Sequence, residues 1–205
     1  IDEVIVTASK RGAGVSIQDT PMSITALSSD TIEKRDLIQL SDFVNTIPGV
    51  ALQETDGVDQ RIHIRGISLV TDGNTSVSTY LGEIPLSSAA AGNVNLRLVD
   101  IERVEVLKGP QGTLYGSGAS AGTLRYIPVA PNLDAVEGSL EVNVATLAES
   151  DDTSQSFTGA FNIPLIEDTL ALRVAAYRFE DAGYVDAVST PAAEAVAVAT
   201  GTSVR

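Results

Sequence analysis

The chain has 205 residues, of which 43% are hydrophobic and 20% are charged, enough for one or two globular units. Its formal net charge of −14 argues against nucleic-acid binding, because contacts to phosphates need clustered Lys and Arg. The absence of cysteine excludes disulfides and thiolate metal sites, and the single histidine, His63, has only carboxylates as possible co-ligands for zinc.

Membrane and export signals are few. No run approaches the roughly 18 to 20 apolar residues of a membrane-spanning helix, so any crossing of a membrane must use β-barrel strands. No signal peptide is visible, and we expect that the chain begins after its removal.

The first segment with strand character is Ile1–Ala8, where apolar and polar residues alternate before the polar, glycine-containing stretch Ser9–Gly14. An extended segment beside such a stretch is either an edge strand of its own domain or a mobile strand that pairs with another protein. From these residues alone, the first alternative is the simpler one.

Two short helices are expected next. Asp30 is placed to cap the first, over Thr31–Asp36, and Glu33 completes a capping box. Ser41 is placed to cap the second, over Asp42–Thr46, and the Pro-Gly pair that follows ends it.

Strands are expected wherever apolar and polar residues alternate between turn signals. These segments are Pro21–Leu27, Gly49–Glu54, Arg61–Ile67, Thr79–Leu86 and Ile101–Lys108. In the third of them Arg61, His63 and Arg65 share one face, which indicates a polar or solvent-exposed surface. His63 is not expected to be catalytic, because neither a cysteine nor a serine nucleophile elbow accompanies it.

Five glycines follow the last of these strands within fourteen residues, namely Gly109, Gly112, Gly116, Gly118 and Gly122. A nucleotide-binding loop would need Gly-Lys-Ser/Thr or Gly-x-Gly-x-x-Gly, whereas this cluster gives Gly-x-Gly-x-x-x-Gly and has no lysine in place. A set of ordinary tight turns is the simplest alternative.

A third interpretation rests on a resemblance to a known family. The run Ile101–Gly122, IERVEVLKGPQGTLYGSGASAG, strongly resembles the signature of the plug domain of TonB-dependent outer-membrane receptors. In that family a strand "ERVEVLKGP" is followed by "GxLYG", a small-residue turn and another strand. Shorter matches are Leu40–Val44, Ile47–Val50 with its "PGV" turn, and the "IRG" of Ile64–Gly66. Gly82-Glu83 departs from the family's "YxDGxP" and leaves the form of that turn open.

The resemblance implies three groups of functional residues. The N-terminal segment resembles the TonB box, so the expected TonB-binding residues are Asp2, Glu3, Val4, Ile5, Val6, Thr7 and Ala8, on a mobile terminus. Arg65 and Arg103 are expected to reach acidic residues of the barrel and hold the plug in place. Loops over residues 55–60, 71–78 and 87–95 are expected to face the ligand, with Asp56, Gln60, Asp72, Asn74, Ser87, Ser88 and Asn93 as candidate contacts.

Beyond the Pro-rich boundary at Pro128–Asn132 the pattern changes to three longer alternating segments, Leu140–Ala145, Phe157–Ile163 and Leu170–Tyr177. Their period of two is typical of outer-membrane barrel strands, although a soluble β-sandwich shows the same alternation. Large ligand transporters of this type use about 22 strands, so the sequence indicates a fragment.

The sequence therefore predicts an α+β fold. Residues 1–13 form a TonB box and linker, residues 14–132 a mixed-sheet plug domain with short helices, and residues 133–205 the first antiparallel strands of a truncated transmembrane β-barrel. The resemblance implies a receptor in the outer membrane of a Gram-negative bacterium that takes up a scarce nutrient such as a ferric siderophore. Its partners would be TonB, that nutrient and outer-membrane lipid, with no nucleic acid, cofactor, metal or catalytic residue.

Two alternatives stay open. One is a soluble or surface β-rich ligand-binding protein, and the other is a receptor of the same family for a glycan or a vitamin. An enzyme would need a convergent catalytic cluster, and the adjacent carboxylates Asp151-Asp152 and Glu180-Asp181 are more simply solvated loop residues than a Ca²⁺ site.

Overall fold

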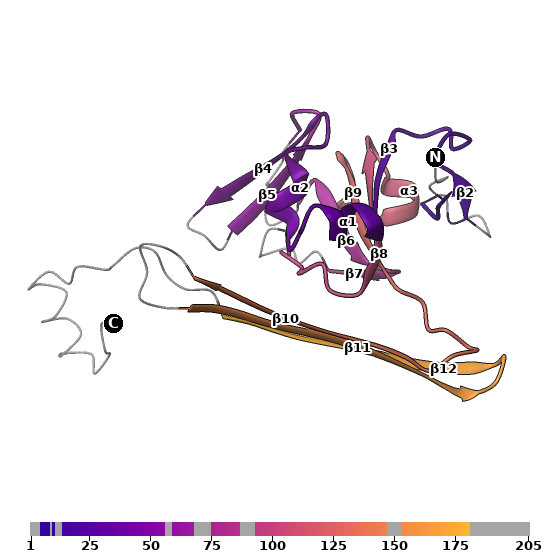
Figure 1. The fold of residues 1–205 in the computed structure, drawn as a ribbon. Helices are drawn as coiled ribbons and strands as arrows, with labels where there is room; N and C mark the ends of the chain where they lie inside the picture. The colour runs from indigo at the N-terminus through magenta and orange to yellow at the C-terminus, as the bar shows by residue number, and fades with distance from the viewer. Residues whose placement is uncertain are drawn as a thin grey trace, which may run out of the picture.

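The computed structural model describes residues 5–8, 10, 14–55, 59–67, 75–86, 93–146 and 153–180. Figure 1 shows an N-terminal body, coloured indigo to pink, and a long three-stranded sheet, coloured orange to yellow, that lies along one side of it. In the described part of the chain, no helix has the length and apolar character that spanning a membrane requires.

A mixed five-stranded sheet forms the centre of the body, in the order β3-β8-β9-β6-β7. Its strands are β3 (Ile24–Ser28), β6 (Val77–Leu81), β7 (Ile84–Pro85), β8 (Ile101–Lys108) and β9 (Gly122–Pro128). β8 is antiparallel to β3 and β9, whereas β6 runs parallel to β9. Gly122 is required where β9 meets β8, since a Cβ there would lie 2.3 Å from the carbonyl oxygen of Leu107.

Both predicted helices are present, but their caps differ from the expected ones. α1 (Ser29–Lys34) begins earlier than predicted and is capped by Ser28, whose Oγ accepts a hydrogen bond from the backbone N–H of Thr31. α2 (Leu40–Val44) also begins earlier, because the Asp42 carboxylate accepts from the backbone N–H of Gln39. The expected caps at Asp30 and Ser41 are therefore wrong, since a nearby side chain already satisfies each helix start.

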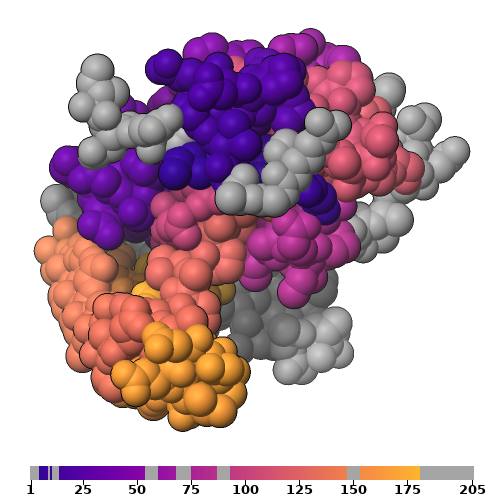
Figure 2. Space-filling model, turned by 90° about the vertical axis from the view of Figure 1, so that its right-hand side faces the viewer, coloured from indigo at the N-terminus to yellow at the C-terminus, as the bar shows by residue number. Residues whose placement is uncertain are grey.

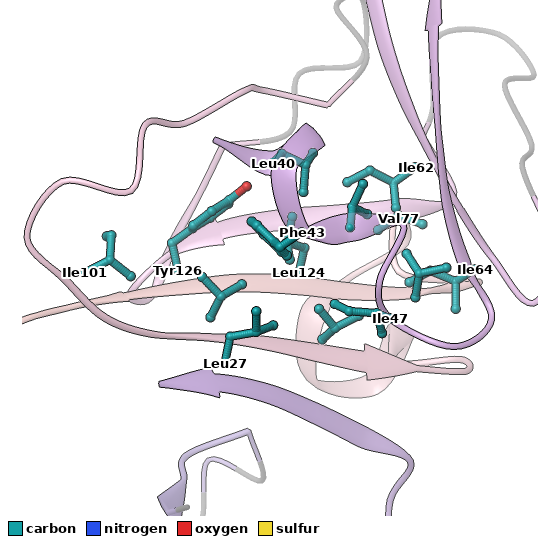
Figure 3. Packing of buried hydrophobic residues seen from close by; sticks show 14 of the residues in the cluster. Leu27, Leu40, Phe43, Ile47, Ile62, Ile64, Val77, Ile101, Leu124 and Tyr126 are labelled. Atoms are coloured by element: carbon teal, nitrogen blue, oxygen red, sulfur yellow. The ribbon is translucent and has the colours of Figure 1, made fainter. Parts of the chain in front are cut away.

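The main hydrophobic core lies between one face of the sheet and three covering elements: α1, α2 and the hairpin of β4 (Val50–Thr55) and β5 (Asp59–Ile64). Val104 of β8 lies between Leu27 and Tyr126 on the neighbouring strands. Figure 3 shows Leu40 and Phe43 of α2 and Ile62 and Ile64 of β5 beside the side chains of this face. The fully buried members include Leu40, Phe43, Val44, Ile64, Val77, Val104, Val106, Leu124 and Tyr126.

The opposite face of the sheet is covered as well. The small two-stranded sheet of β1 (Ile5–Val6) and β2 (Val15–Ser16) and the helical turn α3 (Gly112–Tyr115) lie over it. A second, smaller cluster of buried side chains forms there, made by Ala8, Leu107, Tyr115 and Ala119. α3 lies within the glycine-rich run, for which a set of tight turns was one of the alternatives.

A separate three-stranded sheet lies beside the body. It consists of β10 (Glu137–Thr146), β11 (Thr153–Ile166) and β12 (Leu170–Glu180). Leu140 to Val144 pair with β11 and not with β8, so this sheet lies beside the body and outside its sheet, as expected. One face of it exposes Leu140, Val142, Val144, Phe157 and Phe161. The other face supplies polar residues to a cavity of about 580 Å³ beside the body, among them Ser139, Asn143, Ser156, Thr158 and Arg173. Figure 2 shows this sheet packed against the body.

The body has a polarity along the long sheet. In Figure 1 β4 ends, and β5 begins, toward the end where β10 and β12 finish, whereas β2 and its partner β1 lie toward the end with the β11–β12 turn. That turn is short, at residues 167–169.

Candidate functional site

The N-terminal segment is docked on the sheet. Ile5 and Val6 pair with Ser16 and Val15, and Val6 and Ala8 are 1% and 0% exposed. The expectation of a mobile terminus is therefore wrong for residues 5–8, because both inward side chains are buried and the backbone is hydrogen-bonded.

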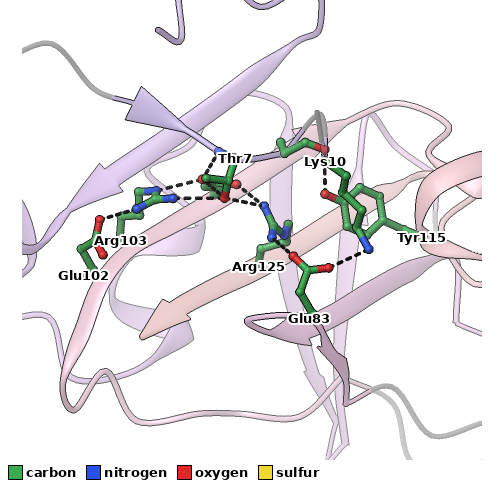
Figure 4. Close-up of polar contacts among 9 residues, drawn as sticks. Thr7, Lys10, Glu83, Glu102, Arg103, Tyr115 and Arg125 are labelled. Carbon is green, nitrogen blue, oxygen red and sulfur yellow. Dashed lines mark hydrogen bonds and ion pairs between the residues drawn. The ribbon is translucent and has the colours of Figure 1, made fainter. Parts of the chain in front are cut away.

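A buried carboxylate holds the middle of this segment. Glu105 of β8 is 0% exposed, and its Oε1 accepts hydrogen bonds from the Thr7 backbone N–H at 2.9 Å and from Arg103 Nε at 2.9 Å. Its Oε2 accepts from Arg125 Nη1 at 2.7 Å. Both guanidinium groups also donate to Thr7 Oγ1, at 3.1 Å from Arg103 and 3.2 Å from Arg125 (Figure 4). Three charged side chains thus converge on one threonine.

The outer part of the cluster involves Glu83 on the β6–β7 turn. Its Oε1 lies 2.7 Å from Arg125 Nη2, and its Oε2 lies 2.8 Å from Lys10 Nζ. The hydrogen bond from Lys10 lowers the pKa of Glu83 below its ordinary value; partial burial acts in the opposite direction, and the charge of Arg125 adds to the lowering. Lys10 also lies over the Tyr115 ring, 4.7 Å from its centroid.

Tyr115 fixes the end of the docked segment. Its hydroxyl donates a 2.7 Å hydrogen bond to the carbonyl oxygen of Ala8, and Tyr80 in turn donates to the carbonyl oxygen of Tyr115 at 2.9 Å. Burial raises the pKa of Tyr115 to about 12, so the hydroxyl keeps its proton and stays a donor at neutral pH.

The face of β8 that carries Arg103 and Glu105 is therefore buried. Arg103 is 9% exposed, and it pairs with Glu102 and Glu105 of its own strand. The expected contact of Arg103 with the barrel is not supported, because its guanidinium is engaged within the body. Sequence reasoning also missed Arg125, Glu83 and Lys10; the "ERVEV" motif that contains Glu105 was the one available signal.

Arg65, the other expected barrel contact, is exposed in this chain and has φ +54°. Its backbone N–H donates to the carbonyl oxygen of Gly49 at 2.7 Å. A contact of its side chain with the barrel stays a prediction.

Different residues join the body to the long sheet. Asp100 forms a bidentate ion pair with Arg173 of β12. Arg173 Nε donates to Asp100 Oδ2 at 2.8 Å, and Arg173 Nη2 donates to Asp100 Oδ1 at 2.5 Å. Arg97 lies over the ring of Phe179, with its guanidinium carbon 4.6 Å from the centroid. Asn162 of β11 is fully buried and donates to the carbonyl oxygens of Asn132 and Ala135. The sequence showed none of these contacts.

Two of the expected ligand contacts are buried. Gln60 is 7% exposed and Asn93 is 5% exposed. Asn93 accepts from the Ile62 N–H and donates to the Val77 carbonyl and to Thr79, so it ties β5 to β6. These two residues have a structural position and are not kept as ligand contacts. The other expected site residues that lie outside the described residues are Asp2, Glu3, Val4, Asp56, Asp72, Asn74, Ser87 and Ser88.

Metal chemistry gains no support from the described part of the chain, where no three His, Cys, Asp or Glu side chains lie close enough to hold an ion. Glu180 pairs with Arg178, and the acidic pair at residues 151 and 152 lies outside the described residues.

Comparison with known proteins identifies the fold. The chain belongs to the family of the TonB-dependent Receptor Plug Domain, whose model matches residues 16–123. That match includes the glycine cluster, so the plug interpretation of this cluster is confirmed against a nucleotide-binding loop. It also confirms the α+β plug architecture, with only part of a barrel present.

Relatives and solved structures agree with this family. The chain is 30% identical over 184 residues to the iron-regulated outer membrane virulence protein of Vibrio cholerae, covering 84% of this chain and 27% of that protein. It is 31% identical over 144 residues to the vitamin B12 transporter BtuB of Vibrio vulnificus, covering 68% of this chain and 22% of that protein. The ferric yersiniabactin uptake receptor FyuA of Yersinia pestis matches with a TM-score of 0.65 and 25% identity, over 77% of this chain and 24% of that one.

The chain thus spans about a quarter of the length of these relatives. They confirm the expected location, the outer membrane of a Gram-negative bacterium. The expectation that the chain is not an enzyme agrees with the family as well.

Proposed function

We propose that this chain is the plug and the first barrel strands of a receptor that imports a scarce nutrient, such as a ferric siderophore, with energy delivered through TonB. Residues 1–13 would be the TonB box and linker, residues 14–132 the plug, and residues 133–205 the start of the barrel. The observation that supports this most is the docking of the TonB-box-like segment on a buried charge cluster of the plug.

The orientation of the plug relative to the short turn of the long sheet supports the same proposal. Outer-membrane barrels have short turns on the periplasmic side and longer loops outside. The docked segment lies toward the short β11–β12 turn, where a periplasmic partner would reach it, and β4 ends toward the opposite end of the long sheet. Asp56, Asp72, Asn74, Ser87 and Ser88 remain our proposed ligand contacts on the outer side.

The substrate class is the second part of the proposal. A ferric siderophore is supported by the similarity to the ferric yersiniabactin uptake receptor of Yersinia pestis and to an iron-regulated outer membrane protein of Vibrio cholerae. The similarity to a vitamin B12 transporter keeps a vitamin as the second candidate. Uptake of labelled ferric hydroxamates, ferric catecholates, vitamin B12 and a maltodextrin by cells with the full-length receptor as their only importer tests this. Uptake of the vitamin or the glycan alone would reassign the substrate.

The role of the N-terminal segment is tested with Val6→Pro, because proline removes a backbone donor that strand addition needs. We expect energised uptake to be abolished while ligand binding to the receptor is unchanged. Val15→Pro, on the partner strand β2, is the matched control and should retain uptake. Normal transport by the Val6→Pro receptor would rule out this segment as the TonB-binding strand.

A further inference from the structure

We propose that Glu83 is a latch that sets how readily the N-terminal segment leaves the plug, and hence how available that segment is to a partner that binds it as an added strand. The identity of the partner rests on the proposed function above. The latch itself rests on contacts within this chain.

The docked segment is not ready for strand addition. Val6 and Ala8 are buried, and the backbone N–H of Thr7 is taken by Glu105. A partner strand needs free backbone donors and acceptors along the segment, so at least part of it must leave the sheet first. The contacts that hold the segment therefore control the binding step.

These contacts differ in how open they are to solvent. The bonds from Thr7 to Glu105 and from Tyr115 to Ala8 lie inside the body. The Lys10–Glu83 ion pair lies at its edge, with side chains 32% and 64% exposed. Release that begins at the edge breaks this pair first.

One carboxylate connects the edge to the interior. Glu83 binds Lys10 of the docked segment with one oxygen and the buried Arg125 of the sheet with the other. Arg125 is 1% exposed, and its Nη1 is shared between Glu105 and Thr7. Loss of Glu83 would free Lys10 and also leave Arg125 with less compensation for its buried charge, so both ends of the segment are affected.

The position of this carboxylate departs from the "YxDGxP" pattern of the family. The turn reads Gly82-Glu83 where the family pattern has Asp-Gly, and Gly82 takes the left-handed conformation with φ +58°. The acidic side chain therefore stands one position later, at the residue whose carboxylate binds Arg125.

The test measures how often the segment opens in the full-length receptor without TonB. This chain has no native cysteine, so in a receptor whose remaining cysteines, if any, are replaced by serine, Val6→Cys provides a single buried thiol. The reaction rate of this thiol with a charged maleimide reports opening. Adding Glu83→Gln, or Lys10→Met, should raise this rate about two- to five-fold, the range expected for a partly exposed ion pair. Adding Lys10→Met to the Glu83→Gln receptor should raise the rate little further, since the Lys10–Glu83 pair is already broken.

Two controls make the result specific. Asp30→Asn breaks the distant Asp30–Lys34 ion pair, whose carboxylate side chain is as exposed as that of Glu83, 63% against 64%. This change should leave the labelling rate of the Val6→Cys thiol unchanged. A thiol placed by Val104→Cys in the core should stay unreactive, which excludes general loosening. An unchanged rate for the Val6→Cys thiol when Glu83→Gln is added, or equal increases at both thiols, would overturn the latch.

Failure of the proposed function would look different. If the latch is right but the partner is not TonB, the Glu83→Gln receptor would still open faster, and added TonB C-terminal domain would leave the labelling rate of the Val6→Cys thiol unaltered. If both are right, Glu83→Gln would also strengthen binding of that domain by a factor similar to the increase in opening.

Discussion

Glu105 shows how much one residue of this plug depends on its surroundings. It is fully buried between the guanidinium groups of Arg103 and Arg125, and it also accepts from the backbone of Thr7. A buried charge is tolerated only when it is paired and hydrogen-bonded, and here each carboxylate oxygen has a donor. The same carboxylate therefore stabilises the sheet and the docked segment.

Replacing this carboxylate by an amide should destabilise the plug strongly. Glu105→Gln leaves two buried arginines with less negative charge, and removal of one partner from a buried ion pair costs about 3 to 5 kcal/mol. We expect the urea concentration that exposes a thiol at Val104→Cys in the full-length receptor to fall markedly.

The neighbouring acid on the same strand is the matched control. Glu102 also pairs with Arg103, but its side chain is 47% exposed. Glu102→Gln should cost about 0 to 1 kcal/mol, as exposed ion pairs do. Equal shifts for the two variants would mean that the burial of Glu105 has no energetic consequence.

Among the elements, the contact between the body and the long sheet is made by polar groups. Asp100 precedes β8 and meets Arg173 of β12, and both side chains are largely buried, 12% and 16% exposed. Arg97 and Phe179 add a second contact nearby. The resemblance had assigned the contact between plug and barrel to Arg65 and Arg103. The Asp100–Arg173 pair could not be predicted, because the sequence of one strand does not show which distant residue its charged side chains will meet.

Breaking the Asp100–Arg173 pair should loosen the plug in its barrel. Asp100→Asn and Arg173→Gln should each raise the passive entry of large antibiotics through the non-energised receptor, because the remaining charge is left unpaired in a largely buried site. The exchanged pair Asp100→Arg with Arg173→Asp should restore part of the seal.

Arg65→Ala in the same antibiotic assay tests the contact that stays a prediction. Leakage with unchanged ligand affinity would place Arg65 at the barrel wall. A sealed pore with lost affinity would place it in the ligand site instead.

If the two Asp100–Arg173 variants leak no more than the parent receptor, that pair does not hold the plug.

At the scale of the whole molecule, the long sheet is incomplete by itself. Within the part of the chain that the structure describes, β10 and β12 each pair with β11 alone, and the outward face exposes Leu140, Val142 and Phe157 to 80%, 53% and 44%. Open edges beside an apolar face promote association in water. In a barrel the same face would lie against lipid.

The isolated chain of 205 residues should therefore associate in aqueous buffer and become monodisperse only in detergent. Removal of residues 133–205 should reduce this association, since it removes the apolar face. Sedimentation velocity with and without detergent provides the measurement. A monomeric 205-residue chain without detergent would instead favour the soluble ligand-binding alternative.

The sequence by itself determined the strands and the family. Alternation with a period of two located β8 at Ile101–Lys108 and the three long strands, because side chains of a strand point to opposite faces whatever the strand contacts. The ordered run from β8 through the glycine cluster was long enough to identify the plug.

Only the tertiary structure decided which faces are buried and what each charge binds. Alternation alone does not show that the polar face of β8 is covered. The N-terminal segment, about a hundred residues away in the sequence, packs over this face, so Glu105 is buried and binds the Thr7 backbone. In the same way Asn93 became a link between strands and not a ligand contact. A sequence pattern records the direction of a side chain, whereas its burial and its partners depend on which distant segment packs against it.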